Sequence, residues 1–180
     1  EDLFKYLFPC TAPLLENDSK VEQLINFTLE STDSRIKAKK PVTPAFFYAV
    51  FLWPTLLEET NLLQEKGLPL LVALEKAMNA TLSKQSKHIS IPKRFTQAMR
   101  EMWLLQLRLP KRLGTRAYKT LEHPRFRAAY DFLLLRTLAG EESSELGDWW
   151  TTFQETNDQD RKEMIDKLQR QKNKPNKLII

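Results

Sequence analysis

Two aspartates, Asp158 and Asp160, have the spacing of a carboxylate pair that binds two metal ions in phosphate chemistry. In that role both carboxylates face the substrate from a rigid scaffold, usually from alternate positions of a strand. Here the pair begins a polar, charged helical segment over 158–171, where acidic groups favourably meet the positive end of the helix dipole. We therefore predict that these aspartates stabilise a helix start and do not form a metal site.

Other residue types that support catalysis are few. Cys10, the only cysteine, follows Pro9 in an apolar segment, which favours a structural thiol. His88 lies in a polar connection, and His123 precedes Pro124 at an expected helix start, where a histidine caps or packs. The sequence contains no G-x-S-x-G, Walker A or G-x-G-x-x-G motif. We expect no catalytic residue and no metal site in this chain.

Basic residues concentrate in one block. Residues 84–127 contain 12 basic and 2 acidic residues. Residues 128–166 contain 3 basic and 10 acidic residues. The net charge of the whole chain is +5. Such a block predicts a polyanionic partner, with nucleic acid as the first candidate. The candidate RNA-binding residues are Lys93, Arg94, Arg100, Arg108, Lys111, Arg112, Arg116, Lys119, Arg125 and Arg127.

The spacing of three of these cations supports phosphate contacts. Lys93, Arg100 and Arg108 fall roughly on one outer stripe of an expected helix over 92–109, away from its apolar face. Basic side chains at such spacing can contact successive phosphates of one strand.

The alternative is that the block forms ion pairs within the chain. The acidic segment 128–166 offers partners, and Arg94, Arg125 and Arg127 are the candidates most open to this role. For the block as a whole we favour nucleic acid, because two acidic residues cannot neutralise twelve basic ones.

Aromatic residues could stack on RNA bases. Helical spacing places Trp103 in the core, whereas Tyr118 remains a candidate platform. Trp149 and Trp150 are adjacent and point about 100° apart on a helix, so we expect one of them to be exposed and available to a base.

Helical periodicity dominates the chain, and no segment alternates as a strand does. Proline and glycine mark helix ends, and Ser19 with Glu22 predicts a capping box. The segment 46–53 is apolar around its circumference, which predicts a central, deeply buried helix. We predict an all-α fold, a compact domain of about eight helices with a basic C-terminal tail beginning near Lys172.

The sequence predicts no membrane segment. The longest uncharged stretch, 41–57, is shorter than the roughly 20 residues that a bilayer span needs. The chain opens at Glu1 without a secretion signal, so we expect a piece of a longer, cytoplasmic protein.

Several motifs together resemble the carboxy-terminal region of bacterial poly(A) polymerases. The run Leu121–Asp131, with the sequence LEHPRFRAAYD, is the most specific of them. The others, in the order of that family, are Leu7-Phe8-Pro9, Pro44-Ala45-Phe46, Ile91-Pro92-Lys93-Arg94, Met102–Arg108 and Trp149-Trp150. The similarity covers most of the chain.

The resemblance implies an enzyme that adds AMP from ATP to RNA 3′ ends without a template, related to CCA-adding tRNA nucleotidyltransferases. In that family an amino-terminal head binds ATP and Mg²⁺, a helical neck reads the ATP base, and a helical body and tail hold RNA. The resemblance then assigns residues 1–90 to the end of the neck and the body, 91–157 to a basic RNA-binding region packed on it, and 158–180 to a polar helix and tail.

On this interpretation the chain binds single-stranded RNA 3′ ends and has no transfer activity alone. One alternative is the tail of a CCA-adding enzyme. A second, of a different class, is a non-enzymatic helical module that holds a protein partner in an apolar groove near Trp149 and Trp150. Where the family often ends in a dense Arg and Lys tail, this sequence ends in a short Lys-rich segment finishing Leu178-Ile179-Ile180.

Overall fold

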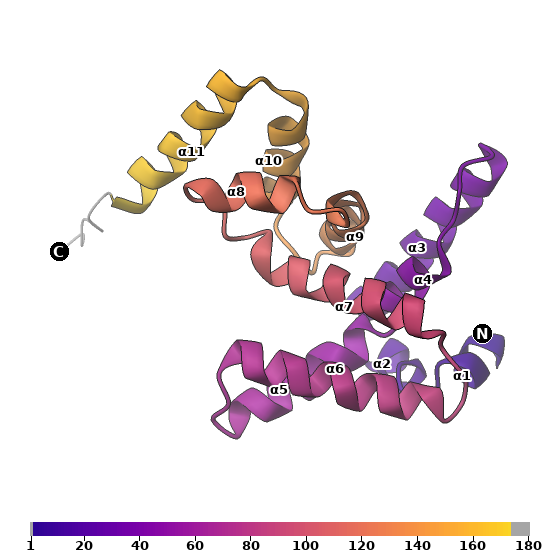
Figure 1. Ribbon diagram of the computed structural model, residues 1–180. Coiled ribbons are helices and arrows are strands. Elements are labelled where there is room, and N and C mark those ends of the chain that lie inside the picture. The colour runs from indigo at the N-terminus through magenta and orange to yellow at the C-terminus, as the bar shows by residue number, and fades with distance from the viewer. Residues whose placement is uncertain (1, 174–180) are drawn as a thin grey trace.

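The computed structural model describes residues 2–173, which form eleven α helices and no strand (Figure 1). The all-α prediction is confirmed, and the helix count in these residues exceeds the expected eight or so because short helices such as α2 stand alone. Of the predicted tail, residues 174–180 lie outside the described residues. The helices are α1 (Asp2–Leu7), α2 (Ala12–Asn17), α3 (Ser19–Lys37), α4 (Pro44–Phe51), α5 (Trp53–Glu65), α6 (Leu70–Ser86), α7 (Lys93–Arg108), α8 (Thr115–Leu121), α9 (Phe126–Leu138), α10 (Ser144–Glu155) and α11 (Asp158–Asn173).

Proline and glycine set several helix ends as the sequence predicts. Thr43 is the N-cap of α4, and Pro44 takes the first helical position, where its missing N–H costs nothing. Pro54 lies in the first turn of α5, so the chain bends at Leu52 and the apolar segment divides into two helices. Gly140 follows α9 with φ +71°, a backbone conformation that residues with a Cβ rarely adopt.

The start of α3 differs from the expected capping box. Asp18, in an extended conformation, is the N-cap, and its side chain accepts a hydrogen bond of 2.9 Å from the backbone N–H of Lys20. Ser19 is the first helical residue. The carboxylate is the stronger acceptor for an orphan N–H and also complements the helix dipole, which explains why it displaces the neighbouring hydroxyl.

Asp18→Ala is expected to lower the free energy of unfolding by about 1 kcal/mol, because it removes the acceptor at this helix start. Ser19→Ala, the matched control, is expected to change it by less than about 0.5 kcal/mol. Urea unfolding followed by circular dichroism measures both values. A larger loss of unfolding free energy for Ser19→Ala than for Asp18→Ala would mean that Ser19, and not Asp18, caps this helix.

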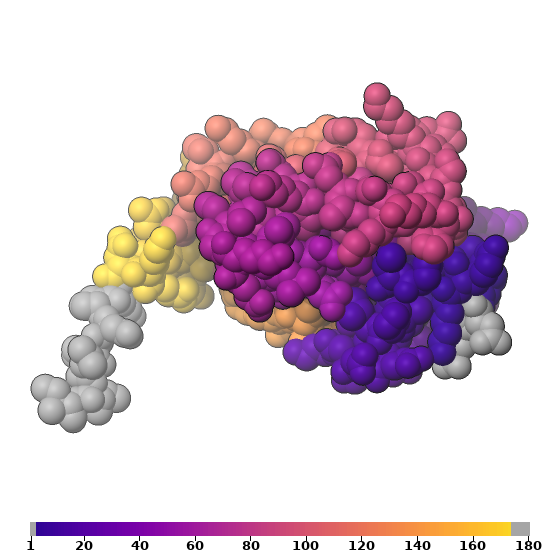
Figure 2. Space-filling view, turned by 90° about the horizontal axis from the view of Figure 1, so that it is seen from below, coloured from indigo at the N-terminus to yellow at the C-terminus, as the bar shows by residue number. Residues whose placement is uncertain are grey.

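The first core cluster includes α4, whose Ala49, Val50 and Phe51 are buried. Phe46, Phe47 and Tyr48 on the same helix are only half-buried, so burial does not extend around the whole circumference as predicted. Val50, Leu52 and Trp53 are fully or almost fully buried among residues of α1, α3, α6 and α7. The indole N–H of Trp103 donates a 2.9 Å hydrogen bond to the backbone oxygen of Ala49, which joins α7 to α4. The α5–α6 hairpin covers one face of the molecule, beside the N-terminal helices (Figure 2).

The second core cluster lies at the other end of the molecule, where α8, α9, α10 and α11 meet the end of α7. Trp149 and Trp150 are 9% and 0% exposed, so the expectation that one of them is exposed is wrong. Trp149 stacks on Phe153 at 4.5 Å, and the indole N–H of Trp150 donates to the backbone oxygen of Leu109. The helix α11 extends from this end, with Ile165 as its one buried residue.

The helices α7 and α9 contribute to both clusters and pack against each other. On α7, Met102 and Trp103 face the first cluster while Leu105 and Leu109 at its end face the second. Four of the basic residues of the block are therefore carried on a helix that joins the two cores, namely Lys93, Arg94, Arg100 and Arg108. This arrangement gives these charged side chains a rigid scaffold.

Candidate nucleic-acid interface

The largest group of candidate cations lies at the end of α7 and on α8. Arg108, Lys111, Arg116 and Lys119 are all exposed, and within the described residues none of them has a carboxylate partner. The N–H of Lys111 donates to the backbone oxygen of Arg108 at 2.8 Å, which keeps these two within one turn. Arg116 and Lys119 share one face of α8, opposite its buried Ala117.

A second group lies at the start of α7. Lys93 and Arg94 are exposed, and the Arg94 guanidinium lies 4.9 Å from the ring centre of Phe95. Arg100, two turns on, donates a 2.7 Å hydrogen bond to the side-chain oxygen of Asn79 on α6. Lys93 and Arg94 are separated from Arg108 by most of the helix, roughly 20 Å at 1.5 Å per residue.

Arg112 is held by contacts with other side chains of the protein. Its guanidinium makes a two-point contact with Glu145 at 2.8 and 3.1 Å and lies 5.1 Å from the ring centre of Trp149. The side chain is 14% exposed, so it covers the tryptophan and links the 110–114 turn to α10. This contact is the pairing between basic block and acidic segment that the alternative interpretation expects.

Arg125 and Arg127 flank the start of α9. The Nε of Arg125 lies 3.2 Å from Glu101 on α7, and the Nε of Arg127 lies 3.1 Å from Asp131 one turn along its own helix. Hydrogen bonds from Gln97 and then Arg125 lower the pKa of Glu101, so its carboxylate stays charged and continues to hold Arg125 at neutral pH.

The turn before α9 differs in detail from expectation. The helix begins at Phe126 and not at Pro124, because His123 accepts the Arg125 N–H through its Nδ1 at 3.1 Å and holds the chain in a turn. Arg125 thus becomes the N-cap residue of α9. The turn at His123 therefore sets the position from which the Arg125 side chain extends.

The aspartate pair takes the structural role that its sequence setting predicts. Asp160 accepts hydrogen bonds from the side chains of Thr156 and Asn157, and Asp158 pairs with Arg161. Both acids lie in the first turn of α11. Within residues 2–173, no group of three or more His, Cys, Asp or Glu residues is placed to hold a metal ion. In the same residues no helix is both long and apolar enough to cross a bilayer.

The sequence model of one protein family, described as "Polymerase A arginine-rich C-terminus", matches residues 66–178. This match covers more than half of the chain and includes every candidate cation. The chain belongs to this family. The resemblance stated from the motifs alone is confirmed.

Individual relatives of this polymerase A region agree with the family match. The chain is similar to proteins named poly(A) polymerase I, with 43% identity over 171 residues in Escherichia coli O157:H7 and 42% over 171 residues in Salmonella typhi. Each alignment covers 92% of this chain and 37% of the relative. The relative from Haemophilus influenzae is 38% identical over 179 residues, which is 97% of this chain and 40% of that protein. The chain thus spans well under half the length of these relatives.

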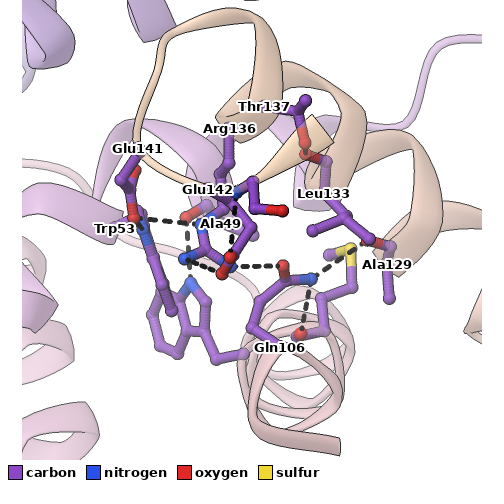
Figure 3. Close-up of polar contacts among 12 residues, drawn as sticks. Ala49, Trp53, Gln106, Ala129, Leu133, Arg136, Thr137, Glu141 and Glu142 are labelled. Carbon is purple, nitrogen blue, oxygen red and sulfur yellow. Dashed lines mark hydrogen bonds and ion pairs between the residues drawn. The ribbon is translucent and has the colours of Figure 1, made fainter. Parts of the chain in front are cut away.

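The sequence did not predict one buried polar network of this chain, which centres on Arg136. Its guanidinium donates to Glu141 and to the side-chain oxygen of Gln106, each at 3.0 Å, and lies 4.7 Å from the ring centre of Trp53 (Figure 3). The indole N–H of Trp53 donates to the same Glu141 oxygen at 2.7 Å. The available signal was a lone charged residue in the stretch 132–138, which is otherwise apolar except for Thr137, followed closely by two glutamates.

This network joins α5, α7, α9 and the turn after α9 at the seam between the two cores. Gln106 also donates a 3.0 Å hydrogen bond to the backbone oxygen of Ala129, so α7 is held directly to α9 (Figure 3). Arg136 and Gln106 therefore hold α7 against α9, and these two helices carry five of the ten candidate cations.

Proposed function

We propose that this chain is the RNA-binding carboxy-terminal region of a poly(A) polymerase, an enzyme that adds AMP from ATP to RNA 3′ ends. The relatives named poly(A) polymerase I favour poly(A) addition over CCA addition. We assign ATP and Mg²⁺ binding to the rest of the enzyme and expect no transfer activity from residues 1–180 alone. We also propose a cytoplasmic location, because the substrate of the proposed enzyme is cellular RNA.

The observation that carries the proposal is the set of exposed cations without a carboxylate partner in the described residues. Six of the ten candidates have this property and are called the basic surface below, namely Lys93, Arg94, Arg108, Lys111, Arg116 and Lys119. A surface of unneutralised cations on a rigid scaffold binds the phosphates of a nucleic acid by releasing its counterions. The binding has little dependence on base sequence, because phosphates carry no sequence information.

The alternative of a non-enzymatic module that binds a protein partner depended on an apolar groove near Trp149 and Trp150. Trp149 and Trp150 are packed inside the second core and covered by Arg112, so they do not line an apolar groove.

We also propose that residues 91–157 have RNA binding as their main role and that residues 1–90 form the body on which this region packs.

A four-site variant tests the proposal. Replacing Arg108, Lys111, Arg116 and Lys119 by Ala is expected to weaken binding of a single-stranded oligoribonucleotide at least tenfold at about 50 mM salt. Each of these side chains is exposed and lies outside the core, so the fold is expected to persist.

The matched control removes the same charge elsewhere. Lys20, Lys37, Lys66 and Lys76 are exposed lysines outside the basic block, and their joint replacement by Ala is expected to change the affinity less than threefold. Fluorescence anisotropy gives both dissociation constants. Equal losses in the two variants would mean that net charge, and not this surface, determines binding.

A further inference from the structure

A cavity of about 710 Å³ opens between α3 and α9, beside the basic block. Its walls come from α3, the 41–43 connection and α9, and its floor comes from α4 and α7. The volume falls in the range of small-molecule sites, which are commonly about 300–1,000 Å³. No sequence motif predicted it, because its walls are far apart along the chain.

The floor and rim of this cleft differ in chemistry. Phe46, Phe47 and Met102 supply an apolar floor with two aromatic rings, neither fully buried by the protein itself. Arg125 and Arg127, two of the candidate RNA-binding residues, line the rim. The cleft thus places an apolar, partly aromatic surface within reach of the cations expected to bind phosphate.

One carboxylate organises the rim. Asp131 lies 3.1 Å from the Nε of Arg127 and 3.9 Å from the Nη1 of Arg35 on α3, so it connects the two walls. Arg35 also donates to the backbone oxygen of Pro41 through Nε and Nη2, at 3.3 and 3.2 Å. The Arg127 side chain remains 71% exposed. Its other guanidinium N–H groups are therefore open to a phosphate, while its position is already fixed.

A second cavity of the described residues, about 390 Å³, provides a contrast. It lies between α2, α3 and α5, and its lining includes Lys20 against four acids, which are Asp18, Glu58, Glu65 and Glu141. That lining is net negative, whereas the first cleft carries three arginines against Glu30 and Asp131. A polyanion is therefore favoured by the first cleft and repelled by the second.

We infer that the α3–α9 cleft binds an unstacked base of the RNA strand whose phosphates lie on the basic surface. Single-stranded RNA is recognised in this way when a splayed base rests on aromatic or apolar side chains while the backbone is held by cations. The inference rests on the proposed function, because without RNA on the basic surface no base is delivered to the cleft.

The test compares a base-bearing oligoribonucleotide with an abasic oligomer of the same length and charge. The natural chain is expected to bind the base-bearing oligomer about tenfold more tightly, the effect of stacking one base. Ser31→Trp with Leu138→Trp fills the opening from both walls. Both residues are exposed, Leu138 at 62%, so the fold is expected to persist. This variant is expected to lose the preference and to keep its affinity for the abasic oligomer.

The matched control places the same two changes at the second cavity. Asn61 and Leu62 are likewise an exposed polar residue and an exposed leucine, so Asn61→Trp with Leu62→Trp should retain the tenfold preference. A preference that survives in the Ser31/Leu138 variant would overturn the inference, as would equal affinity of the natural chain for both oligomers. Failure of the proposed function gives a different result, since neither oligomer would then bind with strong salt dependence.

Discussion

Arg136→Ala is expected to lower the free energy of unfolding by about 3 kcal/mol, because it removes the buried cation of a charge network whose carboxylates then have no counter-charge. Gln106 would lose the donor to its side-chain oxygen, and Glu141 would retain the Trp53 indole N–H as its hydrogen-bond donor from the network (Figure 3). Arg136 and Gln106 are 8% and 3% exposed, so water has little access to the contact between these two side chains. Urea unfolding followed by circular dichroism measures the loss.

Two controls separate the network from the removal of any arginine. Arg127→Ala removes an arginine of the same helix that also pairs with a carboxylate, but this side chain is 71% exposed, so a loss below about 1 kcal/mol is expected. Arg136→Ala with Glu141→Gln removes both charges, and we expect this double variant to be at least about 1 kcal/mol more stable than the summed effects of Arg136→Ala and Glu141→Gln imply. Additive effects would show that the two groups do not act together.

Phe51→Asp is expected to abolish cooperative folding, with a loss above about 4 kcal/mol. Phe51 packs against Phe4, Phe8 and Phe47, with ring centres 5.2–5.7 Å apart. An aspartate there would bury a charge among aromatic rings without a hydrogen-bond partner. Differential scanning calorimetry detects the loss of the unfolding transition.

Phe51→Leu is the control for that position. It keeps an apolar side chain of smaller volume, and we expect a loss of about 1–2 kcal/mol with the transition preserved. An unchanged melting temperature for Phe51→Asp would show that α4 is not part of the core and would contradict the described packing.

The parts of the fold that depend on neighbours in sequence were predictable. Pro44 and Gly140 act through their own backbone geometry, so the helix ends near them follow from the sequence alone. At α3 two neighbouring side chains, Asp18 and Ser19, compete for the same cap, and local pattern alone did not decide between them.

The parts that depend on distant segments were not predictable. Adjacent tryptophans on an isolated helix point in different directions, but α8, α9 and Arg112 enclose α10 so that Trp149 is buried as well as Trp150. Arg136 finds Gln106 thirty residues away. Among the candidate cations, net charge identified the block, whereas only the fold separates Arg112, held by Glu145 and Trp149, from Arg108 with no carboxylate partner in the described chain.

The salt dependence of RNA binding tests the central claim most directly. The affinity of the natural chain for a short single-stranded oligoribonucleotide is measured by anisotropy at several salt concentrations. If the basic surface neutralises about five phosphates, log K falls against log salt with a slope of about −3.5, from roughly −0.7 for each contact on a single strand. Between about 50 and 200 mM salt this slope corresponds to a loss of affinity of about a hundredfold. An affinity that does not change with salt, or no binding at low salt, would contradict the account and leave the basic block as an intramolecular partner of the acidic segment.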